Sequence, residues 1–210
     1  MSEASRALQE PWPDLAIQRE GVHVGVWVFL ASEILFFSGL FITYAVYRSF
    51  NQEAFQEAAK HTEILYGTIN TGLLLTSSMT MTVALRAASA ELRRLTLYCL
   101  IATALLGAAF LFCKGLEYHD DLEKHLFPGA AFPLSSPPTQ LFWMLYWIMT
   151  GIHAVHLSAG IAVVIAVAVL FWRRVLPVQG STMQGVATYW HFVDSVWLVL
   201  YPLLYLVGRS

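Results

Sequence analysis

The segment LFWMLYWIMTGIHAVHLSAGIAVVIAVAVLF runs from Leu141 to Phe171 and contains no Asp, Glu, Lys or Arg. An α-helix rises about 1.5 Å per residue, so about 20 apolar residues cross the roughly 30 Å hydrocarbon core of a membrane. This segment is longer than that. We therefore expect a transmembrane helix whose first turn stands outside the hydrocarbon, or one that is tilted as a whole.

Four further stretches of the chain have the same apolar character. Glu33 is the one charged residue in the first of them, Asp194 is the one in the last, and Lys114 closes the third predicted span. The strict alternation over about ten residues that is typical of membrane barrel strands is missing. The sequence therefore predicts an all-α integral membrane protein, a bundle of five transmembrane helices in one domain, 23–208. The predicted spans are 23–47, 64–85, 95–114, 141–171 and 186–207.

The composition excludes several classes of protein. Hydrophobic residues make up 57% of the chain and charged residues only 12%, whereas soluble domains average about 45–50% and about 25%. A soluble enzyme or a nucleic-acid binder is therefore excluded. The chain contains no CxxC, HExxH or CxxCH motif, so we expect no metal site. We also expect no catalytic residue, because no nucleophile is accompanied by a base and an orienting group.

Basic residues predict the orientation of the helices. Residues 1–22 are polar and lack the apolar core of a signal peptide, so we expect a cytoplasmic segment and targeting by the first span. The short loops 86–95 and 172–185 together contain five arginines. Cytoplasmic loops are enriched in Lys and Arg. The N-terminus is therefore predicted inside and, with five spans, the C-terminus outside.

Glu33 is a candidate functional residue because an ionisable group at membrane depth costs about 3 kcal/mol even on lenient scales. It lies ten residues after His23, which places it about 15 Å into the predicted span. One interpretation is a carboxyl group that exchanges a proton or controls a structural change. The other is a side chain that only hydrogen-bonds a neighbouring helix, and the sequence leaves both open.

Two histidines lie near the middle of the fourth predicted span. His153 and His156 are three residues apart, so they lie on one face of a helix. A metal ion would need two more donors, and His23 and His191 are predicted nearer the cytoplasmic edge. We therefore favour hydrogen bonding to a neighbouring helix over metal ligation.

The last predicted span begins with a second polar pair. His191 and Asp194 are again three residues apart and follow Trp190. The carboxylate can stabilise a protonated imidazole and fix its tautomer. The alternative, which we favour slightly, is a polar anchor at the membrane interface beside an aromatic belt.

The end of the third predicted span is crowded with charges. Glu117 and Tyr118 are followed by further acidic residues, and Lys114 is one helical turn before Glu117. We expect Lys114 to pair with Glu117. The remaining charges indicate a solvated rim outside the membrane.

These polar positions, with their neighbours, carry a resemblance to subunit III of the haem–copper oxidases, the cytochrome c and quinol oxidase family. Each matching pattern is weak by itself, but together they occur in the same order and at matching intervals. The four segments are Trp27–Gly39 (WVFLASEILFFSG), Glu117–Tyr118, Thr150–His156 (TGIHAVH) and Tyr189–Trp197 (YWHFVDSVW).

The resemblance implies a non-catalytic accessory subunit of a proton-pumping terminal oxidase that reduces O2 to water in a bacterial cytoplasmic membrane. Subunit III of this family carries no redox metal, so haem and copper are expected in partner subunits. Its partners are subunit I, subunit II, other respiratory components and membrane lipids, with no nucleic acid. A phospholipid is the one ligand that the resemblance leaves open for this chain.

The resemblance also assigns roles to residues. In the family, subunit III packs on subunit I near the cytoplasmic entry of its proton uptake path, sustains proton delivery and protects the binuclear centre during turnover. Glu33 matches the family's buried carboxylate, which reacts with hydrophobic carbodiimides. Helix packing, lipid headgroup contact or proton buffering is implied for the other matching positions, His153, His156, Trp190, His191 and Asp194.

Two departures from the family pattern matter. Longer members have seven spans, with a lipid-holding cleft between the first two and the remaining five, whereas this chain resembles the five-helix form. Its cleft can be carried over only if a partner supplies two helices. In addition, Lys114 stands where members often have Gln, which adds a positive charge near the outer rim.

Other functions stay open at this point. The accessory subunit of bacterial nitric oxide reductase shares the five-helix body and much of the last-helix pattern. A small transporter that works alone is disfavoured, because the chain has no interrupted helices at paired positions and no inverted repeat. The sequence leaves open whether the electron donor is cytochrome c or quinol, and which haems the complex holds.

Overall fold

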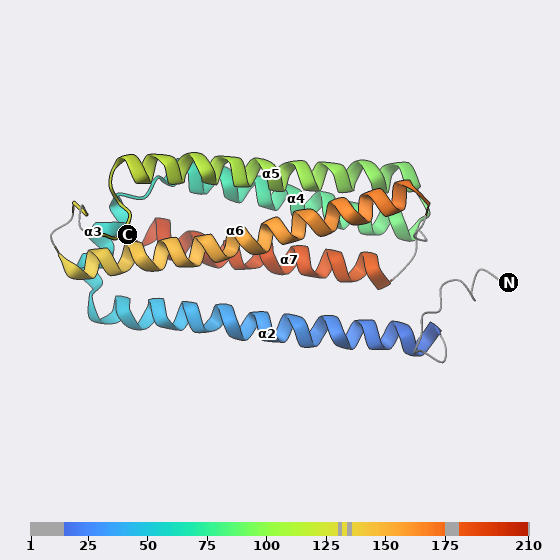
Figure 1. Ribbon diagram of the computed structural model, residues 1–210, viewed down its shortest axis with the longest axis horizontal. Helices are drawn as coiled ribbons and strands as arrows, with labels where there is room; N and C mark the ends of the chain where they lie inside the picture. Colours follow the sequence, from blue (N-terminus) through green and yellow to red (C-terminus); the bar gives the residue numbers. More distant parts are fainter. Residues whose placement is uncertain (1–14, 130–131, 134–135, 175–180, 210) are drawn as a thin grey trace.

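The computed structural model describes residues 15–129, 132–133, 136–174 and 181–209, and these residues form helices joined by short connections (Figure 1). No strand occurs among them, which confirms the all-α prediction. The described helices are α2 (Leu15–Phe50), α3 (Gln52–Lys60), α4 (Ile64–Ser89), α5 (Arg93–Glu123), α6 (Pro137–Trp172) and α7 (Ser181–Tyr201), then a π-helical turn η1 (Pro202–Leu206) and a 3-10 turn η2 (Val207–Arg209).

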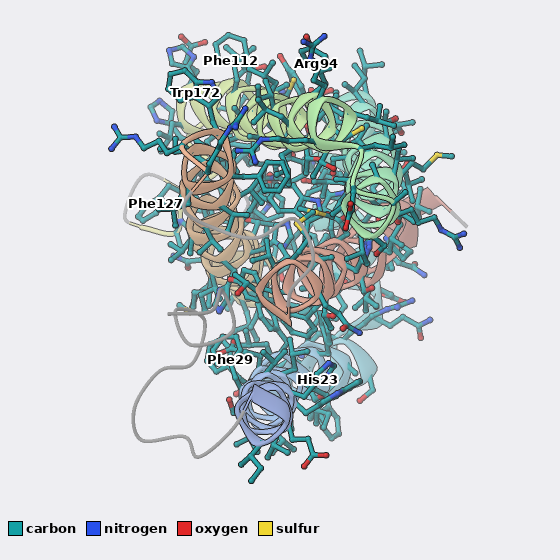
Figure 2. All side chains as sticks on the ribbon, turned by 90° about the vertical axis from the view of Figure 1, so that its right-hand side faces the viewer. His23, Phe29, Arg94, Phe112, Phe127 and Trp172 are labelled. Atoms are coloured by element: carbon teal, nitrogen blue, oxygen red, sulfur yellow. The ribbon has the colours of Figure 1, made fainter. Side chains whose placement is uncertain are left out.

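Four of the long helices surround a common core. Helix α5 packs between α4 and α6, and α7 closes the ring by packing on both α6 and α4. Helix α2 lies outside the ring, against α7 and α6 (Figures 1 and 2). The fully buried side chains of Trp143, Trp190 and Trp197 belong to the core between these helices.

The spacing of buried residues explains how α5 packs. A buried position recurs every three or four residues, which places all of them on one stripe of the helix. Gly107 lies in this stripe, where a Cβ atom would be 2.9 Å from the Trp190 ring. The stripe consists of Thr96, Leu100, Thr103, Gly107, Phe110, Lys114, Glu117 and Asp121.

Three helices in the described residues are long and apolar enough to cross a membrane: His23–Phe50, Arg93–Glu123 and Pro137–Trp172. They contain three of the five predicted spans. Helices α4 and α7 cover the predicted spans 64–85 and most of 186–207 but fall short of the same criterion, so five spans stay a prediction.

Several helix boundaries differ from the predicted spans. Helix α5 continues past Lys114 to Glu123, and α2 already begins at Leu15, within the predicted polar segment 1–22. Residues 1–14 of that segment lie outside the described residues. Helix α6 begins at Pro137, where a proline costs no hydrogen bond because the first turn has no partner for its N–H groups.

The short helix α3 was not predicted. Phe55, Ala58 and Ala59 share one face of it and are buried, which is the spacing of an amphipathic helix. This face packs against α6 and η2 at one end of the bundle. A Cβ atom on Gly208 would lie 2.6 Å from the Gln56 carbonyl oxygen, so this contact requires glycine.

The last helix changes form at Pro202. Proline has no N–H to donate and cannot continue the α-helical hydrogen bonds, and the chain turns through η1 and η2. The Tyr44 hydroxyl of α2 donates a hydrogen bond to the Leu203 carbonyl oxygen in this turn. The altered helix end is therefore tied to α2.

Candidate functional site

Glu33 forms the main polar contact between α2 and the rest of the bundle. Its Oε2 atom lies 2.9 Å from Nε2 of His156 on α6. The Glu33 and His156 side chains keep 18% and 20% of their surface exposed. The structure therefore brings two of the predicted site residues into contact. Because both side chains are partly exposed, a small molecule dissolved in the membrane can reach them.

The hydrogen bonds of His156 determine where its protons can be. Its Nδ1 atom lies 2.9 Å from the Ile152 carbonyl oxygen, which can only accept, so Nδ1 carries a hydrogen. Nε2 then either accepts from a protonated Glu33 or, in the imidazolium, donates to the Glu33 carboxylate. In either of these two forms the residues share one proton, and the pair has no net charge.

Aromatic side chains surround this pair. The Phe37 ring meets the His156 ring edge-on at 5.1 Å between centroids, and Phe36 stacks on it at 6.3 Å. The Tyr189 hydroxyl donates to the His156 carbonyl oxygen over 3.0 Å. Aromatic packing thus holds the imidazole in place and covers one side of its contact with Glu33.

His153 does not share the environment of His156, although it lies on the same helix. Its ring lies 5.6 Å from that of Phe110 and 5.2 Å from that of Trp197, and it is 1% exposed. Neither of its nitrogens has a hydrogen-bond partner in the described part of the chain. The prediction of hydrogen bonding between helices is thus confirmed for His156 and wrong for His153.

His191 and Asp194 are not joined either. The His191 Nδ1 atom lies 2.7 Å from the Ser78 hydroxyl of α4, with Thr82 at 3.4 Å from Nε2. Asp194 is buried with its carboxylate near the same Ser78 hydroxyl, and it makes no well-formed hydrogen bond among the described residues. Because α7 begins at Ser181, both residues lie deeper in the bundle than the predicted cytoplasmic edge.

Trp190 and His23, two further residues singled out from the sequence, also contact neighbouring helices. The Trp190 indole N–H donates to the buried Ser77 hydroxyl over 3.2 Å. His23 lies on the exposed surface near the start of α2, where Nε2 is 3.2 Å from the Gln184 amide oxygen of α7. These contacts position helices and bring no third group to Glu33 and His156.

A second polar cluster lies buried where α5 meets α6 and η1. The Lys114 ammonium lies 3.0 Å from Glu117 Oε2, and it donates to the hydroxyls of Tyr146 at 2.9 Å and Tyr205 at 2.7 Å. The predicted Lys114–Glu117 pair is therefore confirmed. Glu117 is 0% exposed, and the predicted solvated rim is wrong for Asp121, which is 1% exposed.

The tyrosines of this cluster complete its hydrogen bonding. Both hydroxyls lie 2.7 Å from Glu117 Oε1, and Tyr146 also lies 2.9 Å from Asp121 Oδ2. The neighbouring Tyr118 hydroxyl bonds that of Thr150 at 2.7 Å. The sequence analysis did not predict that Tyr146, Tyr205 or Asp121 belongs to a buried cluster. The helical spacing of Lys114, Glu117 and Asp121 was the signal that could have indicated it.

Beyond this cluster the charges do reach solvent. The Lys124 ammonium donates to Glu63 Oε1 over 2.6 Å, and both side chains are nearly half exposed. The hydrogen bond to Glu63 raises the pKa of Lys124 above its ordinary value. In the described residues no group of three or more His, Cys, Asp or Glu side chains is placed to hold a metal ion.

Comparison with known proteins gives a consistent result. A family model described as cytochrome c oxidase subunit III matches residues 14–209. Subunit 3 of the cytochrome bo(3) ubiquinol oxidase of Pseudomonas aeruginosa is 30% identical over 88% of this chain and 84% of its own length. Cytochrome c oxidase subunit 3 of Corynebacterium diphtheriae is 33% identical over 89% and 88%, and quinol oxidase subunit 3 of Bacillus subtilis is 32% identical over 88% and 86%.

Proposed function

This chain belongs to the cytochrome c oxidase subunit III family, and we propose that it is a non-catalytic accessory subunit of a proton-pumping terminal oxidase. In this proposal it packs on subunit I, stabilises it and supports proton uptake during the reduction of O2 to water. The haem and copper centres reside in partner subunits, and this chain holds none.

The Glu33–His156 pair is the observation that carries the proposal. A carboxyl oxygen and an imidazole nitrogen of two different helices lie 2.9 Å apart, a distance at which the two groups can share one proton. Transfer of the shared proton between Oε2 and Nε2 leaves the net charge of the pair unchanged. The transfer therefore needs no additional counter-charge in a medium of low dielectric constant. Such a pair can hold a proton close to a transfer path in a partner subunit.

The membrane arrangement is part of the same proposal. Helices α4 and α7 run alongside the three candidate spans, which supports five spans. The five arginines in the loops 86–95 and 172–185 support an N-terminus in the cytoplasm, and the bacterial relatives support a bacterial membrane. Helix α2 has little cover from its own chain, with Val28, Leu35 and Ile42 each more than 60% exposed. A partner subunit of the oxidase is the natural cover for this flank.

The oxidase assignment is tested by identifying the subunits that copurify with this chain. Purified in mild detergent, the chain is expected to carry with it a haem-bearing partner of the subunit I type, visible in the optical spectrum. A chain that emerges alone and without haem contradicts the assignment. A partner that reduces nitric oxide instead of O2 indicates the nitric oxide reductase alternative.

Replacing Glu33 with glutamine is expected to abolish labelling of this chain by a hydrophobic carbodiimide while assembly with the oxidase persists. The glutamine amide can still donate to His156 Nε2, but it cannot give up a proton or form the carbodiimide adduct. The oxidase should then lose proton delivery or working lifetime under turnover. The measurements are mass spectrometry of the labelled chain, proton uptake and the decay of activity with turnover.

Glu20→Gln is the matched control, because Glu20 is exposed on the same helix but precedes the candidate span. It should change neither the labelling nor the lifetime. Failure of Glu33→Gln to assemble would show that the carboxyl group is purely structural.

A further inference from the structure

An apolar groove runs along the outer face of the bundle between α5 and α6. It encloses about 450 Å³, and every residue that lines it is apolar. Alanines at 104, 108 and 168 leave the space that larger side chains would fill. The lining includes Leu97, Ile101 and Ala104 of α5, and Ile165, Val169 and Trp172 of α6.

The length of the groove corresponds to one leaflet of a membrane. Its lining extends from Leu97 to Ala108 on α5 and from Ile161 to Trp172 on α6, which is about 16 Å along each helix axis. Half of a hydrocarbon core of roughly 30 Å is about the same depth. The groove therefore has the length of an acyl chain that begins at one membrane surface.

Arginines gather at one end of this groove. Arg93 donates to the carbonyl oxygens of Phe171 and Trp172, which ties the start of α5 to the end of α6. Arg94 lies one helical turn before the lining residue Leu97, Arg173 and Arg174 directly follow the lining residue Trp172, and all three are exposed. In the described residues none of these three forms an ion pair with a carboxylate.

The arginine end and the groove lie on the same side of the molecule. In Figure 2, Arg94 and Trp172 lie at the α5 side of the bundle, whereas His23 and Phe29 lie at the α2 side. The groove is thus separate from the Glu33–His156 pair, which lies between α2 and α6. Trp172 is 69% exposed at the mouth, as expected of tryptophan at a membrane interface.

We propose that this groove binds an anionic phospholipid of the cytoplasmic leaflet, with an acyl chain along α5 and α6 and the phosphate held by Arg94, Arg173 and Arg174. Guanidinium groups match phosphate oxygens through paired hydrogen bonds. An apolar helix of a partner subunit would fill the groove, but it would have no use for the three guanidinium groups at its end, whereas the phosphate of an anionic lipid complements their charge. The inference goes beyond the oxidase role and does not depend on it.

Photocrosslinking tests the site in the complete protein, reconstituted into phosphatidylcholine vesicles. The probe is phosphatidylglycerol with a diazirine on one acyl chain, compared with phosphatidylcholine carrying the same chain. Crosslinks of the phosphatidylglycerol probe are expected within residues 97–108 and 161–172. Unlabelled phosphatidylglycerol should suppress them, and unlabelled phosphatidylcholine should not.

Two variants separate the headgroup from the groove. Each arginine near an anionic lipid surface contributes about fivefold in affinity, so replacing Arg94, Arg173 and Arg174 together with glutamine should weaken phosphatidylglycerol binding about a hundredfold. Replacing Arg48 and Lys60 with glutamine, at the other end of the bundle, is the charge control. Ala108→Phe blocks the deep end of the groove and should lower crosslinking with the arginines intact, whereas Ala45→Phe on exposed α2 should not.

Two results would overturn the proposal. Equal competition by phosphatidylcholine means that the groove holds bulk lipid without selection. Absence of crosslinks from the intact complex, with the same peptides joined to a partner subunit, means that a protein helix occupies the groove.

Discussion

Replacing Lys114 with methionine is expected to destabilise the bundle by about 3–5 kcal/mol, because removing one partner of a buried ion pair leaves the other charge uncompensated. Methionine has a similar length but no charge. An ammonium group has three hydrogens, and Lys114 directs them to Glu117, Tyr146 and Tyr205. After the change, Oε2 of the fully buried Glu117 has no partner in the described residues.

Lys124→Met is the matched control, because Lys124 also pairs with a glutamate but at a half-exposed position. Exposed pairs contribute about 0–1 kcal/mol. The free energy of unfolding, measured by denaturation in detergent, should therefore separate the two variants clearly. Equal losses would mean that the buried cluster is not held together by its charges.

Adding Glu117→Gln to Lys114→Met should recover part of the loss. The glutamine side chain removes the uncompensated charge and can still accept from the Tyr146 and Tyr205 hydroxyls, which lie 2.7 Å from Oε1. A double variant that is no more stable than Lys114→Met alone would argue against the electrostatic explanation.

Gly107→Leu is expected to destabilise the protein by about 3 kcal/mol, the upper part of the usual cost of overpacking a core. Even one added carbon would lie 2.9 Å from the Trp190 ring and 3.1 Å from Ile161. Trp190 is 1% exposed and its indole bonds Ser77, so the ring has no free space to enter. Helices α5, α6 and α7 would have to move apart.

Gly115→Leu on the same helix isolates this steric effect. A Cβ atom at Gly115 meets no other heavy atom within 4 Å. Leucine also has a better helix propensity than glycine, by roughly 1 kcal/mol, so this variant should unfold at an equal or higher denaturant concentration. Equal destabilisation at both positions would show that glycine is needed for flexibility of α5 and not for close packing.

Much of the fold was predictable because membrane helices are long apolar runs. Each of the five predicted spans falls mainly within one helix of the structure. The end of α5 was missed because charge was taken as a sign of solvent. Lys114, Glu117 and Asp121 continue the three- and four-residue spacing of the buried stripe, so periodicity was the better guide there.

The candidate site was only partly predictable. Glu33 was singled out by its depth, but its partner His156 is 123 positions away in the sequence, and no local pattern joins the two. His153 and His156 share a helix face within about 60°. That difference is enough to direct one toward α2 and the other toward Phe110 and Trp197.

The tie between Tyr44 and Leu203 has a consequence for biogenesis. The two residues are 159 positions apart, and ribosomes add about 5–20 residues per second. Helix α2 therefore remains in the translocon or the lipid for roughly 10–30 s before the ribosome has synthesised the turn whose carbonyl oxygen accepts the Tyr44 hydrogen bond. The exposed aliphatic flank of α2 is stable in contact with lipid during this interval. The nascent chain therefore completes this side of its fold late in translation.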